Sequence, residues 1–552
     1  MMKSTFVYTI LILLFTNVVL AQSSLEPIQK QFTRQDSLRG SITKERTWWD
    51  VKRYQLEVKI NPLDSSIIGS NKINYSILNE YNIIQIDLQE PLQITQVIQD
   101  GKQLKFTREG NAFFIDLIAK QLKGTTKELT VFYNGKPKVA VNPPWDGGLV
   151  WKKDGNGNSF IASACQGIGA SVWWPNKDHP ADEVDCMDIN INVPSKLIGV
   201  SNGRLISTKV QNDGTTTYHW QVLNPINNYG IDFTIGDYVS FSETYPGEKG
   251  NLDCTYYVLK PNLEKAKKHF QEVPRMLKAL EHWFGPYPFY EDGFKLVESP
   301  FLGMEHQSAV SYGNGFKNGY LGSDLSQTGW GLKFDFIIIH ESGHEWFGNS
   351  ITNKDNADMW IHESFTSYSE SLFLEYYYGK QAGYDYVKGT RINIVNDKPI
   401  IGHYNVNDRG SSDMYFKGAN VLHTLRQIVD NDEKWRSILR GLNTTFYHQT
   451  VSTKQVEDYL SKELKLNLTS FFNQYLRDTR IPILEYKILN NKLIFKWNNT
   501  VSDFCMPIKV FINGQSYWIK PSQKWKTKKF SGNIMELKID DNFYILDSRI
   551  AN

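Results

Sequence analysis

The sequence has little cysteine, no excess of either charge and no long apolar run after residue 20. Only 4 of its 552 residues are cysteine, and none has metal-ligand spacing, so a disulfide scaffold and a cysteine metal site are both excluded. Its 61 lysines and arginines nearly balance its 59 aspartates and glutamates, without blocks of like charge. We therefore expect no nucleic-acid partner.

Apolar residues are plentiful enough to build cores. The composition is 41% hydrophobic and 13% aromatic, which excludes disorder as the main state of the chain. At about 100–200 residues per domain, the length predicts about three domains. The near-neutral charge of the chain favours a modest-sized substrate as its partner.

Residues 1–21 have the pattern of a signal peptide. One lysine precedes the apolar run 6–20, small or short residues occupy the two positions that a signal peptidase reads, 19 and 21, and the chain becomes polar at Gln22. An uncleaved membrane anchor is the alternative, but the run is short for a membrane span. We expect export to the periplasm or the medium, with no membrane attachment after cleavage. Export permits a Cys165–Cys186 disulfide, but buried free cysteines fit the sequence equally well.

Hydrophobic periodicity divides the chain into three parts, which predicts a multidomain α+β protein. In residues 22–245, apolar and polar residues alternate in short segments separated by Asn-Gly and Asp-Gly turns, which predicts an N-terminal all-β domain. Residues 246–480 contain the helical patterns, and alternation returns in 481–552, a small C-terminal β-sandwich. Helices are predicted at 262–284, 334–346, 363–378, 418–429 and 453–475. Pro274 should kink or split the first of these.

A His-Glu-x-x-His motif, His340-Glu341-Ser342-Gly343-His344, lies in the middle part. In a helix of 3.6 residues per turn, His340 and His344 face the same way, so both imidazoles can bind one Zn²⁺. Glu341 then lies near the open coordination position, where its carboxylate can take a proton from water. Gly343 lowers helix propensity by about 1 kcal/mol relative to alanine, and a closely packed neighbour is one explanation.

A zinc hydrolase uses three protein ligands and leaves one position open. Glu363 lies 19 residues after His344, at the start of the next predicted helix, which is the ligand order of gluzincins. His362 is the alternative third ligand, but on a helix it faces about 100° away from Glu363. Glu370 lies two turns beyond Glu363, where it can hold a zinc-binding histidine; a solvated charge is its alternative role.

Four stretches together resemble the aminopeptidase N-like zinc metallopeptidases, which are gluzincins with a thermolysin-like catalytic domain. The stretches are Gly303-Met304-Glu305-His306, residues 340–349, residues 360–365 and Tyr415-Phe416-Lys417-Gly418-Ala419. Their order and spacing cover roughly residues 165–480. The resemblance implies an N-terminal β saddle or sandwich, a mostly helical catalytic domain and a small C-terminal β-sandwich.

The resemblance also implies roles for individual residues. Glu305 would bind the free α-amine of a peptide, while Gly303 and Met304 would run beside the substrate as an edge strand. Gln166 would supply a second contact to the amine, and Tyr415 would donate a hydrogen bond to the oxyanion. The sequence departs from the family pattern at His306, where asparagine is usual, which leaves details of the first-residue pocket open.

These features predict a zinc aminopeptidase with one Zn²⁺ per chain, acting as a monomer on peptides with a free N-terminus. A zinc endopeptidase could use the same ligands, but endoproteolysis does not need Glu305 beside the zinc. An epoxide-type hydrolase could also use this zinc, and no sequence feature requires it. A non-catalytic binding module is disfavoured, because every expected catalytic residue type is present.

Overall fold

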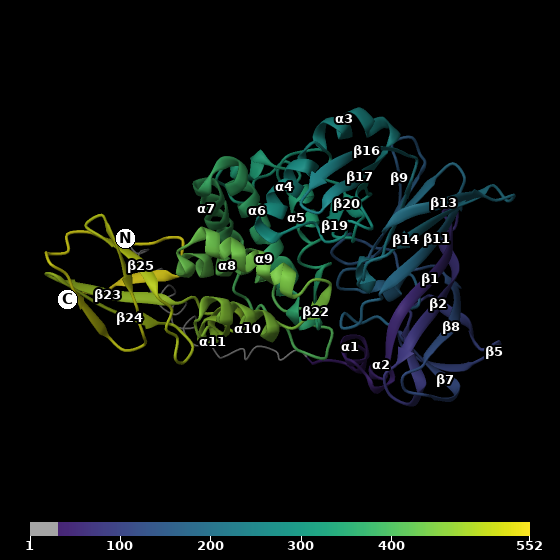
Figure 1. Ribbon diagram of the computed structural model, residues 1–552, viewed down its shortest axis with the longest axis horizontal. Coiled ribbons are helices and arrows are strands. Elements are labelled where there is room, and N and C mark those ends of the chain that lie inside the picture. The colour runs from purple at the N-terminus through teal and green to yellow at the C-terminus, as the bar shows by residue number, and fades with distance from the viewer. Residues whose placement is uncertain (1–30, 552) are drawn as a thin grey trace, which may run out of the picture.

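The computed structural model describes residues 31–551, so the signal peptide predicted at residues 1–21 lies outside the described residues. Two short helices, α1 (Arg34–Gly40) and α2 (Lys44–Thr47), come first. In Figure 1 the chain then runs from strands at one end, through a central group of helices, to further strands at the other end. This order confirms the multidomain α+β architecture.

Three sheets form the N-terminal part. The largest has the order β13 (Arg204–Val210), β14 (Thr215–Val222), β11 (Cys186–Pro194), β1 (Trp49–Asn61), β2 (Ser66–Ile77), β8 (Thr126–Gly135), β4 (Gln93–Gln99) and β5 (Lys102–Gln103). The others are β3 (Tyr81–Asp87), β7 (Ala112–Gln121) and β6 (Lys105–Glu109), and β12 (Ile198–Ser201), β15 (Phe233–Gly236), β10 (Ser159–Ala164) and β9 (Gly148–Lys153). Alternate residues of β14 are buried, as the period-2 pattern predicts.

A five-stranded sheet begins the middle part. Its order is β16 (Tyr238–Gly247), β17 (Gly250–Leu259), β18 (Phe294–Glu298), β20 (Val310–Tyr312) and β19 (Gly303–Met304). β19 is an edge strand that pairs with β20 alone, in antiparallel register. The domain boundary predicted at residues 245 and 246 falls within β16, and the domain limits stay a prediction.

The helices of the middle part follow the predicted periodicity with several differences. They are α3 (Leu263–His269), α4 (Glu272–Phe284), α5 (Phe336–Gly343), α6 (Trp360–Tyr378), α7 (Lys380–Gly389), α8 (Phe416–Val429), α9 (Asp432–Thr445), α10 (Thr453–Leu464) and α11 (Thr469–Leu476). A two-stranded ladder of β21 (Ile351–Asn353) and β22 (Gln449–Val451) lies among them.

Two predicted helices are each divided. The helix predicted at 262–284 breaks into α3 and α4, and Pro274 lies in the first turn of α4, where its missing N–H costs no helical hydrogen bond. The helix predicted at 453–475 is wrong as one element: α10 ends at Leu464, and Lys465, which follows it, has a left-handed backbone with φ of 55°. Helices α7 and α9 were not predicted.

The C-terminal part consists of two small sheets. One has the order β27 (Lys526–Lys529), β24 (Lys492–Asn498), β23 (Ile483–Leu489) and β29 (Leu546–Arg549), and the other β26 (Gln515–Ile519), β25 (Ile508–Ile512) and β28 (Leu537–Ile539). Buried residues of both sheets, such as Trp497 and Val510, belong to one apolar cluster, as in the expected sandwich.

The apolar cores do not follow the three predicted parts one to one. The C-terminal sheets share a single apolar cluster with the helices, whereas the N-terminal sheets have their own. A third, small cluster joins Ala162 and Ala164 of β10 to Phe301 and Met304 beside and within β19. It packs the N-terminal sheets directly against the edge strand of the middle part.

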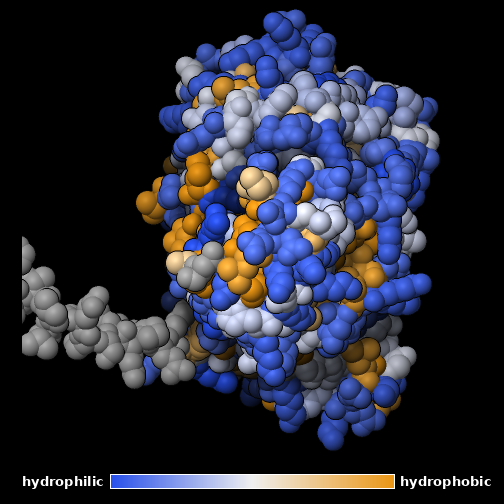
Figure 2. Space-filling model, turned by 90° about the vertical axis from the view of Figure 1, so that its left-hand side faces the viewer, coloured by the Kyte–Doolittle hydropathy of each residue, from blue (hydrophilic) through white to orange (hydrophobic). Residues whose placement is uncertain are grey.

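The surface and the cysteines test the expectations about membrane spans and about a Cys165–Cys186 disulfide. Within residues 31–551, no helix has both the length and the apolar content of a membrane span. Figure 2 shows a mainly hydrophilic face on which apolar residues form separate small groups. Cys165, Cys186, Cys254 and Cys505 are all free thiols, so Cys165 and Cys186 form no disulfide here.

Helices α5 and α6 approach each other closely at Gly343. A Cβ at this position would lie 2.8 Å from Ser369 Oγ and 3.2 Å from Thr366 Cγ2, both on α6. The Ser369 hydroxyl is itself fixed, because it donates a hydrogen bond of 2.6 Å to Thr366 O. The glycine expected to mark a closely packed neighbour therefore allows two helices to touch.

Gly343→Ala should destabilise the protein by about 1–2 kcal/mol, because overpacking outweighs the gain of about 1 kcal/mol in helix propensity. Denaturant unfolding measures the change. The double variant Gly343→Ala/Ser369→Ala removes the obstructing hydroxyl and should recover most of the loss. If Gly343→Ala alone were as stable as the wild type, the proposed helix contact would be wrong.

Candidate active site

A cavity of about 400 Å³ brings together every residue predicted to hold metal, bind substrate or act in catalysis. These residues are Gln166, Gly303, Met304, Glu305, His340, Glu341, His344, Glu363 and Tyr415. They come from a loop after β10, from β19 and the residue after it, from α5 and its C-terminal cap, from the first turn of α6 and from the residue before α8. Glu370 lies behind the cavity wall, on α6.

The first turn of α5, the helix that carries His340, is held in place by side-chain hydrogen bonds. Asp335 caps this helix, since its side chain accepts hydrogen bonds from the N–H groups of Ile337 and Ile338. The same carboxylate accepts from Tyr312 Oη at 2.8 Å. His340 and Glu341 follow in the last turn of α5, and His344 caps its C-terminal end.

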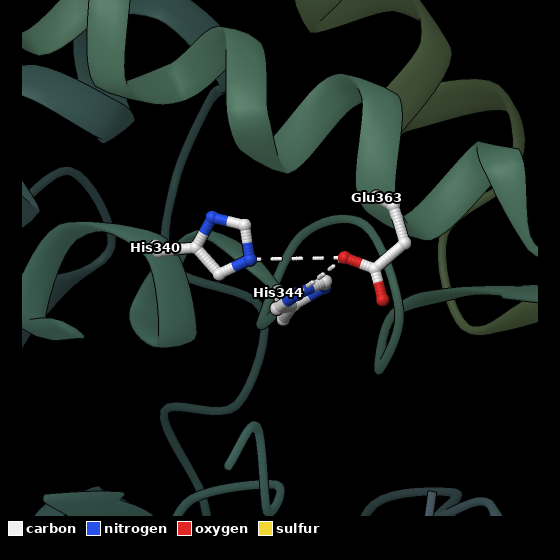
Figure 3. A group of neighbouring side chains, drawn as sticks. All are labelled: His340, His344 and Glu363. Carbon is white, nitrogen blue, oxygen red and sulfur yellow. Dashed lines mark ion pairs between the residues drawn. The ribbon is translucent and has the colours of Figure 1, made fainter. Parts of the chain in front are cut away.

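Figure 3 shows the two imidazoles of His340 and His344 turned toward the Glu363 carboxylate. Glu363 Oε2 lies 3.7 Å from His340 Nε2 and 3.4 Å from His344 Nε2. All three atoms lie within 4.8 Å of one another, and all three residues are buried. Two imidazoles and one carboxylate form the ligand set of several catalytic zinc sites.

Hydrogen bonds on the far side of each ring leave Nε2 free to bind a metal. His340 Nδ1 lies 2.8 Å from Glu370 Oε1, and His344 Nδ1 lies 2.9 Å from Phe347 O. A carbonyl oxygen can only accept, so Nδ1 of His344 carries the hydrogen and Nε2 keeps its lone pair. Glu370 is itself held by Tyr386, whose hydroxyl donates to Oε2 at 2.6 Å.

The Glu363 carboxylate has one satisfied and one unsatisfied oxygen. Oε1 accepts hydrogen bonds of 2.9 Å from both Gln166 Nε2 and Tyr415 Oη. Oε2 is buried, and within residues 31–551 no hydrogen bond reaches it. A buried carboxylate oxygen without a donor is costly. The two Nε2 atoms and Oε2 therefore fit a divalent cation such as Zn²⁺.

His362, the alternative third ligand, is directed elsewhere. Its Nε2 accepts a hydrogen bond of 2.8 Å from the N–H of Asn353, and its Nδ1 lies 3.2 Å from Tyr229 Oη. Burial lowers the pKa of His362 to about 3, so the ring is neutral. Both nitrogens are occupied, which leaves Glu363 as the third ligand.

Glu341 lies against the edge strand. A Cβ on Gly303 would be 2.9 Å from Glu341 Oε1, so the glycine lets the β19 backbone lie close to this carboxylate without moving it. Burial raises the pKa of Glu341 to about 7, against the lowering effect of His340. A carboxylate with such a pKa can both accept and return a proton near neutral pH.

Glu305 and Gln166 meet beside the metal ligands. Glu305 is 2% exposed, and burial raises its pKa. Gln166 Nε2 donates to Glu305 Oε1 at 2.6 Å as well as to Glu363, so one amide joins the two carboxylates. The N-terminal part thus contributes a side chain directly to the site.

Tyr415 places a neutral hydrogen-bond donor beside the metal ligands. Burial and the charge of Glu363 keep its pKa well above the usual value, so its phenol stays protonated. Its ring stacks on His340 at 6.0 Å between centroids. The hydroxyl is therefore held beside the metal-binding atoms and can donate to an oxygen that gains negative charge.

His306, the departure from the family pattern, does not line the cavity. Its Nδ1 lies 3.1 Å from Ser311 Oγ and 3.3 Å from Asp232 Oδ2, inside the protein. Burial lowers its pKa to about 3. The substitution therefore alters the packing behind Glu305.

Sequence reasoning missed other lining residues. Phe336 stacks on His340 at 5.1 Å and lies one turn before it, a spacing that the motif could have indicated. Trp145 and Arg409 come from loops far along the chain, and no sequence signal places them here.

Comparison with known proteins agrees with this geometry. The model of the peptidase M1 N-terminal domain matches residues 51–229, and that of the peptidase family M1 domain matches residues 269–475, together well over half of the chain. A "Probable aminopeptidase 1" of Sulfurisphaera tokodaii is 22% identical over 516 residues, which cover 89% of this chain and 62% of that protein. Leukotriene A-4 hydrolase of Xenopus laevis is 22% identical, over 76% of this chain and 69% of that protein.

Solved structures show the same fold. A mutant of an M1 zinc metallopeptidase from Deinococcus radiodurans, bound to a Tyr-Ser-Ala substrate, superposes with a TM-score of 0.65. The match covers 79% of this chain and 96% of that one, at 20% identity.

The purified protein should bind one Zn²⁺ per chain. Glu363→Ala should abolish tight binding, and Glu370→Gln should weaken it about 10- to 100-fold, because the histidine loses its orienting partner. Competition with a chromogenic chelator measures the affinity. His362→Ala is the matched control and should keep zinc; loss of zinc in this variant, with retention in Glu363→Ala, would reverse the ligand assignment.

Proposed function

Because this chain belongs to the peptidase M1 family, we propose that it is a zinc-dependent aminopeptidase that removes the N-terminal residue of peptides. The observation that carries the proposal is the buried Glu305 carboxylate beside the metal ligands. The ammonium group of a peptide would neutralise the negative charge of this carboxylate. Relatives with the name aminopeptidase support the same activity.

His340, His344 and Glu363 would hold the zinc. When bound there, the ion supplies a Lewis acid that lowers the pKa of water and polarises a carbonyl. Glu341 takes a proton from the attacking water and passes it to the leaving amine. Tyr415 donates its hydroxyl hydrogen to the oxygen on which negative charge develops.

The amino end of the peptide would bind at Glu305 and Gln166. Gln166 Nε2 already donates to two carboxylates, so its Oε1 is the atom that can accept from an ammonium N–H. Because the Glu305 carboxylate lies so close to the metal ligands, only one residue fits between the bound amine and the bond that is cut. The enzyme would therefore cut the bond after the first residue of the peptide.

Two further parts of the proposal rest on the sequence alone. The pattern of residues 1–21 supports export to the periplasm or the medium, and we propose that the mature chain acts there as a monomer. N-terminal sequencing of protein from the native host should begin at Gln22. A chain that retains Met1, or a stable dimer in light scattering, would overturn the corresponding part.

Glu341→Gln should keep zinc and lose most turnover of an aminoacyl-anilide, about 10²- to 10⁴-fold, because it removes the proton acceptor and no ligand. Zinc content and initial rates measure the two effects. Turnover close to that of the wild type would remove Glu341 from this role.

Glu305→Ala should lower kcat/KM on free N-terminal substrates about 30- to 1000-fold while zinc is retained. Opposite charges about 4 Å apart attract by about 4 kcal/mol at an effective dielectric of 20, and part of this is lost to desolvation. Glu305→Gln, which keeps the shape without the charge, should lose activity similarly.

N-acetylated peptides are the control substrates for this variant. Any residual cleavage of them should be unchanged in Glu305→Ala. Equal loss on blocked and free substrates would make Glu305 structural and would favour an endopeptidase. Hydrolysis of an epoxide without hydrolysis of the anilide would favour the epoxide-type alternative.

A further inference from the structure

Arg409 is a cation in the cavity that the mechanism does not use. Among the described residues that line the cavity, it is the only arginine or lysine. Its side chain is exposed, and within residues 31–551 its guanidinium has neither an ion pair nor a hydrogen bond. Other arginines near the helices are paired; Arg426, for example, binds Glu375 at 2.6 Å. The guanidinium of Arg409 is thus available to a ligand.

The loop that carries Arg409 is fixed. Asp408 Oδ2 accepts hydrogen bonds from His403 N at 3.2 Å and His403 Nδ1 at 2.6 Å. The two ends of the loop touch, since a Cβ on Gly402 would lie 2.7 Å from Gly410 N. Tyr404 Oη donates to Asp358 Oδ1 at 2.7 Å, which ties the loop to the segment before α6. Arg409 therefore projects from a rigid base.

The N-terminal helix supports the same loop from the other side. The backbone N–H of Asn407 donates to Asp36 O at 3.1 Å. Gly40 packs on the backbone of Val406, and a Cβ there would lie 2.1 Å from Val406 C. A loop held by α1 and by the start of α6 loses little entropy when a ligand binds to Arg409.

The charges in the cavity are separated. Glu305 marks the amine end, with its carboxylate close to the metal ligands. Arg409 and Tyr415 line the same cavity, Arg409 lies only six positions before Tyr415 in the chain, and its positive charge acts on the Tyr415 side chain. Arg409 therefore lies on the Tyr415 side. With the amine at Glu305 and the oxyanion at Tyr415, this side receives the residues after the cut bond.

We propose that Arg409 binds a carboxylate of the substrate on the leaving side of the cut bond. A planar guanidinium forms paired hydrogen bonds with a carboxylate. The carboxylate could be the C-terminal group of a dipeptide or tripeptide, or an acidic side chain directly after the first residue. The inference rests on the proposed aminopeptidase function and adds a substrate class to it: short or acidic peptides.

Three tripeptide substrates distinguish the sources: Leu-Ala-Ala, Leu-Ala-Ala-amide and Leu-Glu-Ala-amide. For the wild type, kcat/KM should be about 10- to 100-fold higher on at least one carboxylate substrate than on the neutral amide, as expected for a charged hydrogen-bonded pair. Preference for Leu-Ala-Ala indicates the C-terminus, and preference for Leu-Glu-Ala-amide indicates the side chain. Arg409→Gln should bring this ratio close to one.

Lys398→Gln is the matched control. Lys398 is an exposed cation of the same region that does not line the cavity, so its removal should leave the ratio unchanged. Equal loss by Arg409→Gln on acid and amide substrates would mean that Arg409 acts only through Tyr415, and would overturn the proposal. An unchanged ratio in Arg409→Gln would overturn it as well.

A binding measurement separates this inference from the proposed function. In the Glu341→Gln background, calorimetry should give tighter binding of Leu-Ala-Ala or Leu-Glu-Ala-amide than of Leu-Ala-Ala-amide, and Arg409→Gln should remove the difference. Such binding without wild-type turnover of any free-amine substrate would retain the carboxylate site and reject the peptidase function. Turnover without this difference in binding would do the reverse.

Discussion

The buried carboxylate of Glu363 is the group on which the site depends, because its two oxygens connect three parts of the chain. Oε1 accepts from Gln166 of the N-terminal part and from Tyr415, which directly precedes α8. Oε2 faces the Nε2 atoms of the two histidines without any hydrogen-bond donor among the described residues. A cation bound by the two imidazoles would satisfy an acceptor held in this way, so the packing of the protein fits a metal.

The same constraint explains why acidic residues can crowd here. Glu305 and Glu341 each bring a carboxylate oxygen within 4.8 Å of a His344 ring nitrogen and of each other. Like charges so close in a buried site repel strongly, and burial raises the pKa of both residues. A divalent ion held by the two histidines and Glu363 would relieve that repulsion. In the proposed function Glu305 would then anchor the amine and Glu341 would act as the base, and the order Glu305, Glu363, Tyr415 would give the positions of the amine, the cut bond and the leaving side.

The metal centre could be predicted from sequence, because it depends on local spacing. His340 and His344 are fixed by helical geometry, and Glu370 by the two turns that separate it from Glu363. Gln166 and Tyr415 needed the family resemblance, since no local spacing connects them to the motif. Arg409 could not be predicted, because its place depends on how an irregular loop packs between α1 and α6. Helix α9 was missed although Trp435, Ile438, Leu439 and Leu442 follow helical spacing, whereas α7 is short and includes Gly383 and Gly389.

The proposed activity requires that the protein selects the bond to cut by its distance from a free amine. The most direct measurement is mass spectrometry over time of one peptide and its N-acetylated twin, each incubated with the zinc-loaded protein. The free peptide should lose single residues in order from its N-terminus while the acetylated peptide stays intact. Internal fragments, or equal cleavage of both peptides, would contradict it.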